Sequence, residues 1–249
     1  MVESNKSNIP SDWRKAFLDD NNFEQIKTFD YELCVELLEE ACKDMDNLNP
    51  YLLMRPIWEI TKGFRSISSA LSVGFSDLTT KVQVWRDLCK STYTTENSIN
   101  EVIKKEMELN IHELNGENNK EKGHKKKTQY YEYVSATRTL LRLIWFLDFF
   151  TNILSNAVEL KDKSFKECVS MAYDKCLAPH HPWLVRKGAG LGISLSPSKK
   201  EKGLSYFFGG KEEFTSETIE KLNRWRGATL KLWTYLNGHY EANGLLTLP

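Results

Sequence analysis

The chain has 249 residues, and its 34 Lys and Arg residues balance 34 Asp and Glu residues to a formal net charge of zero. This balance excludes a protein that coats nucleic acid, because such proteins are strongly basic overall, but it allows one concentrated cationic pocket. With 41% hydrophobic and 27% charged residues, the composition is typical of a soluble globular protein, built as one large domain or two small ones.

Cysteine usage and the longest apolar run indicate a cytoplasmic protein. The five cysteines are odd in number and none are spaced as CxxC, so neither a disulfide framework nor a zinc knuckle is expected. The first 15 residues contain no apolar segment of the kind found in a secretory signal. The run Leu140–Phe150 is too short to span a bilayer, and it contains Arg142 and Asp148. We expect neither a metal nor another cofactor.

Glycine and proline are distributed unevenly along the chain. Neither residue occurs in the 41 residues from Phe75 to Asn115, or in the 55 residues from His124 to Ala178. A sheet protein needs frequent turns, and no segment alternates steadily between apolar and polar residues. The pattern therefore predicts an all-α fold.

Apolar spacing, capping residues and prolines set the expected helices. Pro50 suits the first turn of a helix, and Ser164 with Glu167 forms a capping box. A helix over Gln129–Asn156 is apolar on most sides, so we expect it to be central and buried. In chain order, the expected helices cover approximately Tyr31–Asp46, Pro50–Ser69, Val73–Tyr93, Asn97–Glu113, Gln129–Asn156, Ser164–Leu177, Pro179 or Pro182 to Leu195, and Ser216–Ala242.

Two stretches between these helices predict loops. Ser196–Gly210 is rich in Ser, Lys and Gly, and we expect a long loop with Tyr206–Phe208 exposed. Gly116–Lys127 contains five Lys against two Glu and almost nothing apolar. This composition predicts a solvated loop, and weak attraction to an anionic membrane is the alternative interpretation.

Polar side chains at helical spacing interrupt otherwise apolar helices at three places. The first is a pair, Asp77 and Lys81, which lie four residues apart and share a face with Trp85. Such a pair is usually a surface ion pair that contributes less than about 1 kcal/mol. Taken alone, it favours no ligand.

The second place is the central apolar helix, where Arg138 and Arg142 lie four residues apart. Two guanidinium groups on one helix face repel each other unless an anion lies between them. Two interpretations remain open: an internal ion pair, with Asp148 or Asp77 as the partner, or a clamp for phosphate, whose oxygens arginine binds in a bidentate fashion.

The third place is a helix start, where His181 precedes Pro182 and Trp183. A histidine here is most simply a helix cap or a core residue with a satisfied ring. The surrounding Cys168, Cys176, His180 and His181 match no standard zinc spacing. Nothing else supports a Cys–His nucleophile, so we expect no enzyme.

Four strings resemble the glycolipid transfer protein superfamily in order, residue types and approximate separations. They are FSDLTTK at 75–81, RTLLRL at 138–143, LAPHHPWLVRK at 177–187 and HYEANGLLTLP at 239–249. The resemblance implies two layers of α-helices that enclose an apolar pocket for lipid chains, with the lipid headgroup held at the surface.

The extent of the resemblance also suggests a division of the chain. It covers residues 31–249, which we expect to form a single domain with a lysine-rich insertion at about 114–128. Residues 1–30 are then an N-terminal extension that we expect to be partly ordered.

Two positions select a branch of the superfamily. Sugar-binding members carry an asparagine where this chain has Lys81, and a tryptophan that stacks on the sugar where this chain has Arg142. The present residues resemble those of the ceramide-1-phosphate transfer proteins and their plant relatives. Exchanging an aromatic ring for a guanidinium group suits an anionic headgroup.

The resemblance implies a role for each polar residue. Lys81, Arg138 and Arg142 are expected to surround the phosphate of a phosphosphingolipid through charge-assisted hydrogen bonds. Asp77 is expected to accept from the amide N–H of the sphingoid backbone, and His181 to donate to the amide carbonyl. An ester cannot donate, so this pair would distinguish sphingolipids from diacylglycerophospholipids.

The same resemblance implies transient contact with membranes. Trp183 is expected at the membrane interface, with Arg186 and Lys187 assisting on anionic lipid. We therefore expect a cytoplasmic, peripherally associated monomer that transfers or senses a phosphosphingolipid and binds no nucleic acid. A carrier of another anionic lipid such as phosphatidic acid, a glycolipid carrier and a helical scaffold that transfers nothing are the alternatives.

Overall fold

The computed structural model describes residues 13–19, 29–67, 69–91, 97–116, 130, 132–207 and 215–249. These residues form helices and connecting segments. Across them we find no strand, but one isolated antiparallel bridge joins Asn115 and Val134. The predicted all-α fold is confirmed.

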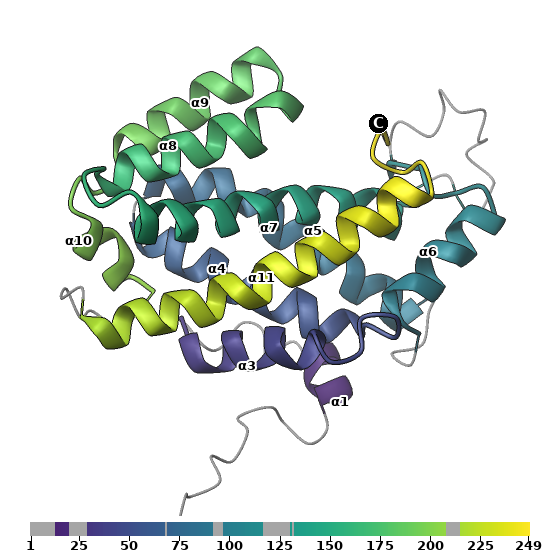
Figure 1. Ribbon diagram of the computed structural model, residues 1–249. Coiled ribbons are helices and arrows are strands. Elements are labelled where there is room, and N and C mark those ends of the chain that lie inside the picture. The colour runs from purple at the N-terminus through teal and green to yellow at the C-terminus, as the bar shows by residue number, and fades with distance from the viewer. Residues whose placement is uncertain are drawn as a thin grey trace, which may run out of the picture.

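The helices pack in two layers (Figure 1). In that view α7 and α11 cross the middle of the molecule and contact each other, α8 packs against α7, and α4 and α5 lie behind them as a hairpin. Their bounds are α1 (Trp13–Leu18), α3 (Tyr31–Ala41), α4 (Pro50–Ile67), α5 (Ser69–Ser91), α6 (Ile99–Glu108), α7 (Ala136–Glu159), α8 (Phe165–Cys176), the 3₁₀ helix η2 (Ala178–His180), α9 (Trp183–Ser194), α10 (Lys200–Ser205) and α11 (Ser216–Ala242).

Capping residues fix several helix ends where the sequence predicts them. Pro50 is the first residue of α4, and α11 has the predicted bounds, with Thr215 as its N-cap. Both hydrogen bonds of the Ser164–Glu167 capping box are present at the start of α8. Other ends differ: α3 and α6 each end several residues before the predicted position.

The central helix α7 is buried along most of its length, as predicted, because it contacts α5, α6, α8 and α11. Its aromatic residues form the middle of the core with rings from other helices. The ring centroids of Phe150 and Trp225 of α11 lie 4.6 Å apart. Phe64 of α4 packs edge-on against Phe150, with 6.0 Å between ring centroids. One apolar core therefore joins the two layers.

The expected loop over Ser196–Gly210 is partly wrong. Residues Lys200–Ser205 form helix α10, and Phe207 is buried rather than exposed, because its ring packs against Phe64, 5.2 Å between centroids. Gly63 permits this contact, since a Cβ atom there would collide with the Phe207 ring. Of the other two aromatic residues in the motif, Tyr206 is half-buried, and position 208 lies outside the described residues.

Buried charged side chains hold both ends of α7. At the N-terminal end, the Glu106 carboxylate of α6 accepts hydrogen bonds from the backbone N–H groups of Ala136 and Thr137, at 2.7 and 2.8 Å. At the C-terminal end, Lys200 Nζ of α10 donates to the carbonyl oxygens of Ala157 and Leu160. An anion at the first turn and a cation at the last turn both complement the helix dipole.

The first helix, α1, lies within the predicted N-terminal extension and packs on α4 and α5. Phe17 is buried against Tyr51, and its carbonyl oxygen accepts from Arg86 Nε at 2.9 Å. Most of the predicted insertion, residues 117–128, lies outside the described residues. No helix in the described ranges combines the length and apolarity needed to cross a bilayer.

Candidate functional site

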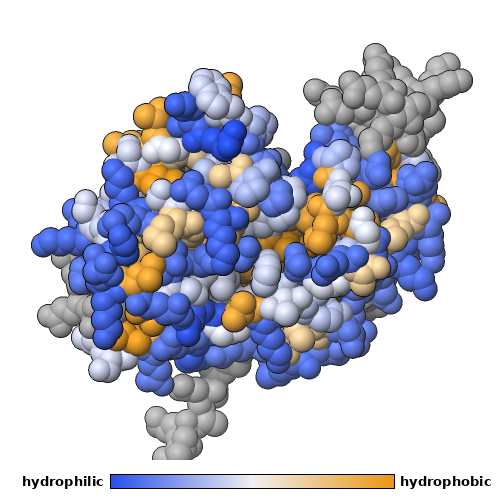
Figure 2. All heavy atoms as spheres, turned by 45° about the horizontal axis from the view of Figure 1, so that its top comes forward, coloured by the Kyte–Doolittle hydropathy of each residue, from blue (hydrophilic) through white to orange (hydrophobic). Residues whose placement is uncertain are grey.

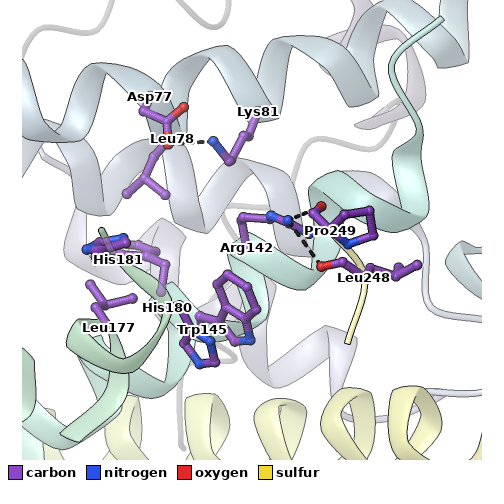
Figure 3. A pocket seen from close by; sticks show the side chains of 11 residues that line it. Asp77, Leu78, Lys81, Arg142, Trp145, Leu177, His180, His181, Leu248 and Pro249 are labelled. Atoms are coloured by element: carbon purple, nitrogen blue, oxygen red, sulfur yellow. Dashed lines mark hydrogen bonds and ion pairs between the residues drawn. The ribbon is translucent and has the colours of Figure 1, made fainter. Parts of the chain in front are cut away.

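A partly open pocket of about 420 Å³ lies where α5, α7, η2 and the segment after α11 meet. In Figure 3, Asp77 and Lys81 reach in from above, Arg142 lies at the centre, and His181 lies across from the segment after α11. Its lining residues are Asp77, Leu78, Lys81, Arg142, Trp145, Phe146, Leu177, His180, His181, Leu248 and Pro249. The pocket therefore unites four of the residues that the sequence analysis selected.

On α5, the predicted pair is formed: Lys81 Nζ lies 2.5 Å from Asp77 Oδ2. The two side chains differ in exposure, at 17% for Lys81 and 68% for Asp77. The pair borders the pocket, so its carboxylate is accessible and its ammonium group lines the same pocket as Arg142.

Arg142 of α7 makes no ion pair with an Asp or Glu side chain in the described part of the chain. Nη1 donates to the carbonyl oxygen of Arg138 at 3.0 Å, and Nη2 donates to the main-chain oxygens of Leu248, at 3.3 Å, and Pro249. The ion pair considered with Asp148 or Asp77 is therefore not formed. The acceptors come instead from the chain 106 and 107 residues further on.

Arg138 lies one turn before Arg142 and is half-buried, but it is not part of the pocket lining. Nη1 donates to Asn115 Oδ1 at 3.0 Å, whereas Nε is buried and has no hydrogen-bond partner among the described residues. Burial lowers the pKa of Arg138, and the charge of Asp77 opposes this shift.

Burial, and next the charge of Arg138, lowers the pKa of Arg142 to about 10. Arg142 is therefore charged at neutral pH, although its environment penalises that charge. Two neighbouring cations that make no ion pair with an Asp or Glu side chain among the described residues form a site that an anion would stabilise.

His181 follows η2 and is held on one side of its ring. Its Nδ1 lies 3.0 Å from the hydroxyl oxygen of Tyr173, which comes from α8. Burial lowers the pKa of His181, and the charges of His180 and Lys81 act in the same direction while Asp77 opposes them. The ring is thus near both charged residues of α5 and faces the same pocket.

Trp145 and His180 form a wall of the pocket to which the sequence analysis assigned no role. Their rings stack with 3.7 Å between centroids and 2° between planes, and the guanidinium carbon of Arg142 lies 5.0 Å from the Trp145 ring centroid. Trp145 lies three residues after Arg142, so helical spacing could have placed it at the site. The stack with His180 depends on tertiary structure.

The residues expected at the membrane lie outside the pocket, on α9. Trp183 is 63% exposed, Arg186 and Lys187 are exposed, and Lys187 Nζ lies 5.5 Å from the Trp183 ring centroid. Hydrophobic residues gather over α8 and α9, toward the upper left of Figure 2. The large exposed hydrophobic residues of these two helices, with the one just after α9, are Met171, Trp183, Leu184, Val185, Leu191 and Leu195.

The described residues contain no group of three or more His, Cys, Asp or Glu side chains that could hold a metal ion. The pocket lining itself combines hydrogen-bond donors, one carboxylate and an apolar wall. It is suited to binding an anionic amphiphile.

Comparisons with known proteins agree with the fold and with the motifs. The family model described as glycolipid transfer protein matches residues 51–203. A zebrafish (Danio rerio) ceramide-1-phosphate transfer protein is 25% identical over 198 residues, which is 77% of this chain and 84% of that protein.

Two solved structures show the same fold. The human ceramide-1-phosphate transfer protein, in complex with 2:0 ceramide-1-phosphate, aligns with a TM-score of 0.74 at 17% identity, over 89% of this chain and all of that chain. A mutant of the Arabidopsis accelerated-cell-death 11 protein, complexed with C12 ceramide-1-phosphate, aligns with a TM-score of 0.64 at 17% identity, over 85% of this chain and 96% of that one. The family consists of lipid carriers that catalyse no reaction. Because the family model covers more than half of the sequence, the chain belongs to the glycolipid transfer protein family.

Proposed function

We propose that this chain carries a phosphosphingolipid such as ceramide-1-phosphate between membranes, and that Lys81, Arg138 and Arg142 hold the phosphate. The observation that carries this proposal is that Lys81 and Arg142 line one pocket although they come from different helices. Similarity to a zebrafish protein named for transfer of this lipid, and to structures that contain it, supports the same substrate class.

Phosphate suits this pocket better than a neutral sugar does. The donors of Arg142 are directed at main-chain oxygens, and a phosphate group offers the planar guanidinium group anionic oxygens that it can bind in a bidentate fashion. A sugar would need an accessible aromatic face, but the Trp145 ring is already stacked on His180. Burial of Arg142 and Arg138 further favours a ligand that brings negative charge.

Asp77 and His181 are proposed to recognise the amide of the sphingoid backbone. The exposed Asp77 carboxylate is available as an acceptor for the amide N–H, and His181 is available as a donor to the carbonyl. A ligand with an ester in this position would leave the carboxylate without its donor, which costs binding free energy. Amide recognition therefore provides selectivity among anionic lipids.

The lipid chains are proposed to enter the core beneath the headgroup site. Leu78, Phe146 and Leu177 form the apolar part of the pocket lining, and Phe146 continues into the aromatic core. Burial of each methylene is worth about 0.8 kcal/mol relative to water, but the bilayer supplies almost the same amount. Selectivity therefore depends mainly on the headgroup contacts, and the exchange between membrane and protein remains reversible.

Uptake and release of such a lipid require contact with a membrane. We assign this contact to Trp183, with Arg186 and Lys187 as weaker contributors on anionic lipid. Their helix α9 begins two residues after His181, so a surface that inserts into the bilayer would lie close to the pocket.

A vesicle-to-vesicle transfer assay tests the phosphate assignment. We expect wild-type protein to transfer ceramide-1-phosphate faster than a neutral glycosphingolipid, and Arg142→Leu to lower the ceramide-1-phosphate rate by roughly ten- to hundredfold, the value of one hydrogen bond to a charged group. Arg226→Leu is the matched control, because Arg226 on α11 pairs with Glu159 outside the pocket.

Two results would contradict the proposal. The first is equal transfer of ceramide-1-phosphate and the neutral glycosphingolipid by the wild-type protein. The second is an unchanged rate for Arg142→Leu. Native mass spectrometry of the purified protein adds an independent check, because a scaffold that transfers nothing would co-purify with no lipid.

A further inference from the structure

The ring of His181 is held by a tyrosine that is not part of the pocket lining. The hydroxyl oxygen of Tyr173 lies 3.0 Å from His181 Nδ1, and the Tyr173 side chain is buried. Its ring packs edge-on against Phe149 of α7, with 6.5 Å between centroids and 89° between planes. Tyr173 therefore connects α7 and α8 to the histidine that follows η2.

We propose that Tyr173 is a positioning residue that donates its hydroxyl proton to Nδ1 of His181 and thereby keeps the proton of the neutral imidazole on Nε2. The choice of tautomer depends on the protein alone. Only its use, donation from Nε2 to the amide carbonyl of a bound sphingolipid, rests on the proposed function.

The hydrogen-bond inventory favours donation from Tyr173 to His181. A neutral imidazole has one donor nitrogen and one acceptor nitrogen, and the partner of one nitrogen sets the role of the other. Among the described residues, Nδ1 of His181 is the one hydrogen-bond partner of the Tyr173 hydroxyl. If Nδ1 carried the proton, the hydroxyl could not donate to it without a clash between the two hydrogens. The hydroxyl would then have to turn its proton away, where no described residue accepts it. Donation by Tyr173 satisfies both groups.

Nε2, the other ring nitrogen of His181, is then the one available as a donor to a ligand in the pocket. Nε2 of His181 has no hydrogen-bond partner within the described ranges, and the ring lines the pocket beside Asp77 and Lys81. Because Asp77 can only accept, a sphingolipid amide needs a donor for its carbonyl. The Nε2–H tautomer supplies that donor, whereas the other tautomer would place two acceptors around one amide.

The electrostatic surroundings keep the ring neutral, so that its tautomer matters. Burial lowers the pKa of His181; His180 and Lys81 add to this shift and Asp77 opposes it. On the other side, burial raises the pKa of Tyr173, with Arg186 opposing and Asp174 adding to that shift. The tyrosine is therefore protonated at neutral pH and retains the proton that it donates.

Nitrogen-15 NMR of the full-length protein without lipid tests the tautomer directly. We expect His181 in the wild type to show a proton on Nε2 and an acceptor-type Nδ1, and His181→Gln assigns these signals. In Tyr173→Phe, which keeps the ring against Phe149, we expect a mixture of tautomers. We also expect a higher His181 pKa, because the lost hydrogen bond stabilised only the neutral ring.

Tyr235→Phe is the matched control. Its ring stacks on His239 at 6.4 Å, and its hydroxyl bonds to Asp46 and Asn100 rather than to an imidazole. We expect it to leave the His181 signals unchanged. A proton on Nδ1 in the wild type, or the same tautomer and pKa in Tyr173→Phe, would overturn the proposal.

The transfer assay separates this inference from the proposed function. Tyr173→Phe should slow ceramide-1-phosphate transfer at neutral pH, and the ratio of its rate to the wild-type rate should approach one as the pH falls through the His181 pKa. An imidazolium donates from both nitrogens, so protonation restores the Nε2 donor. A ratio that stays constant with pH would contradict the positioning role. If the wild type transfers no ceramide-1-phosphate, the proposed function fails, and the NMR result still decides the tautomer.

Discussion

Arg142 is held by main-chain acceptors that a ligand could replace. Arg142 donates to main-chain oxygens of Arg138, Leu248 and Pro249, and the last two residues also line the pocket. A phosphate group would bring more charge and more lone pairs to the same donors. Under the proposed function, lipid binding is therefore an exchange of hydrogen bonds, in which the segment after α11 competes with the headgroup for Arg142.

Asp77 is predicted to determine selectivity between amide and ester lipids. We expect Asp77→Val to slow ceramide-1-phosphate transfer by roughly tenfold or more, the value of a hydrogen bond to a charged group. Transfer of phosphatidic acid should change much less, since its esters cannot donate to a carboxylate. The vesicle assay with each lipid in turn gives this ratio, which does not depend on how well Lys81 is oriented.

Asp87→Val provides the control for this change, since Asp87 lies on the same helix, is exposed and accepts from Gln83 Nε2. It should leave both rates unchanged. An equal loss for the two lipids in Asp77→Val would show that the carboxylate acts on Lys81 alone, and amide recognition would be wrong.

Sequence reasoning could identify the polar half of this pocket because residue types and local spacing carry the signal. Asp77 with Lys81, and Arg138 with Arg142, are each four residues apart, so each pair lies on one face of its helix. The acceptors of Arg142 could not be found in this way. Leu248 and Pro249 reach it only because α11 packs against α7, and no local pattern records that contact.

At the scale of the helices, the position of α7 depends on groups from α6 and α10. The Glu106 carboxylate accepts four hydrogen bonds, from Tyr133, Ser135, Ala136 and Thr137, and these order the turn from which Arg138 projects. Lys200 of α10 donates to carbonyl oxygens at the C-terminal end of α7, and α10 is the helix that the sequence analysis missed. The Ser, Lys and Gly content of this segment favoured a loop. Burial of Lys200 depends on contacts with α7, which the segment itself does not reveal.

Replacing Glu106 should therefore destabilise the protein strongly. Glu106→Ala leaves buried donors at the start of α7 without an acceptor, each costing about 1–3 kcal/mol, so we expect the free energy of unfolding to fall by roughly 3 kcal/mol or more. Urea unfolding followed by circular dichroism measures this loss. Glu106→Gln keeps the shape of the side chain but places an N–H donor beside other donors. Its free energy of unfolding should therefore lie between those of the wild type and Glu106→Ala.

Glu108→Ala is the matched control, two residues away on the same helix and largely exposed. Exposed substitutions of this kind usually change stability by less than about 0.5 kcal/mol. If the two alanine variants unfold at similar urea concentrations, then Glu106 does not hold the N-terminal end of α7.

At the scale of the whole molecule, charge and exposed apolar surface are distributed differently. The formal charge is zero, so no general attraction to an anionic bilayer is expected. Large exposed hydrophobic residues, in contrast, concentrate on α8 and α9; elsewhere in the described ranges only Leu109 and Leu230 belong to this group. A neutral carrier with one apolar surface can bind a membrane by insertion and still leave it, since no long-range attraction retains it.

Membrane binding should therefore depend on the exposed apolar residues of α9 more than on exposed apolar residues of other helices. Leu184 is 73% exposed on α9, and Leu230 is 47% exposed on α11, so a matched pair of leucine substitutions is available. Burying a leucine side chain is worth about 1.5–3 kcal/mol. We expect Leu184→Ser to lower binding to phosphatidylcholine vesicles by roughly tenfold or more in a flotation assay.

Leu230→Ser should bind these vesicles like the wild type, because Leu230 lies on α11 and is not among the exposed residues of α8 and α9. Trp183→Ala should behave like Leu184→Ser, and the Arg186→Gln, Lys187→Gln double variant should show a defect only when the vesicles contain an anionic lipid.

Since the pocket lies outside this surface, Leu184→Ser should retain binding of ceramide-1-phosphate presented in detergent while losing transfer between vesicles. Equal losses of vesicle binding for Leu184→Ser and Leu230→Ser would mean that α9 is not the membrane contact.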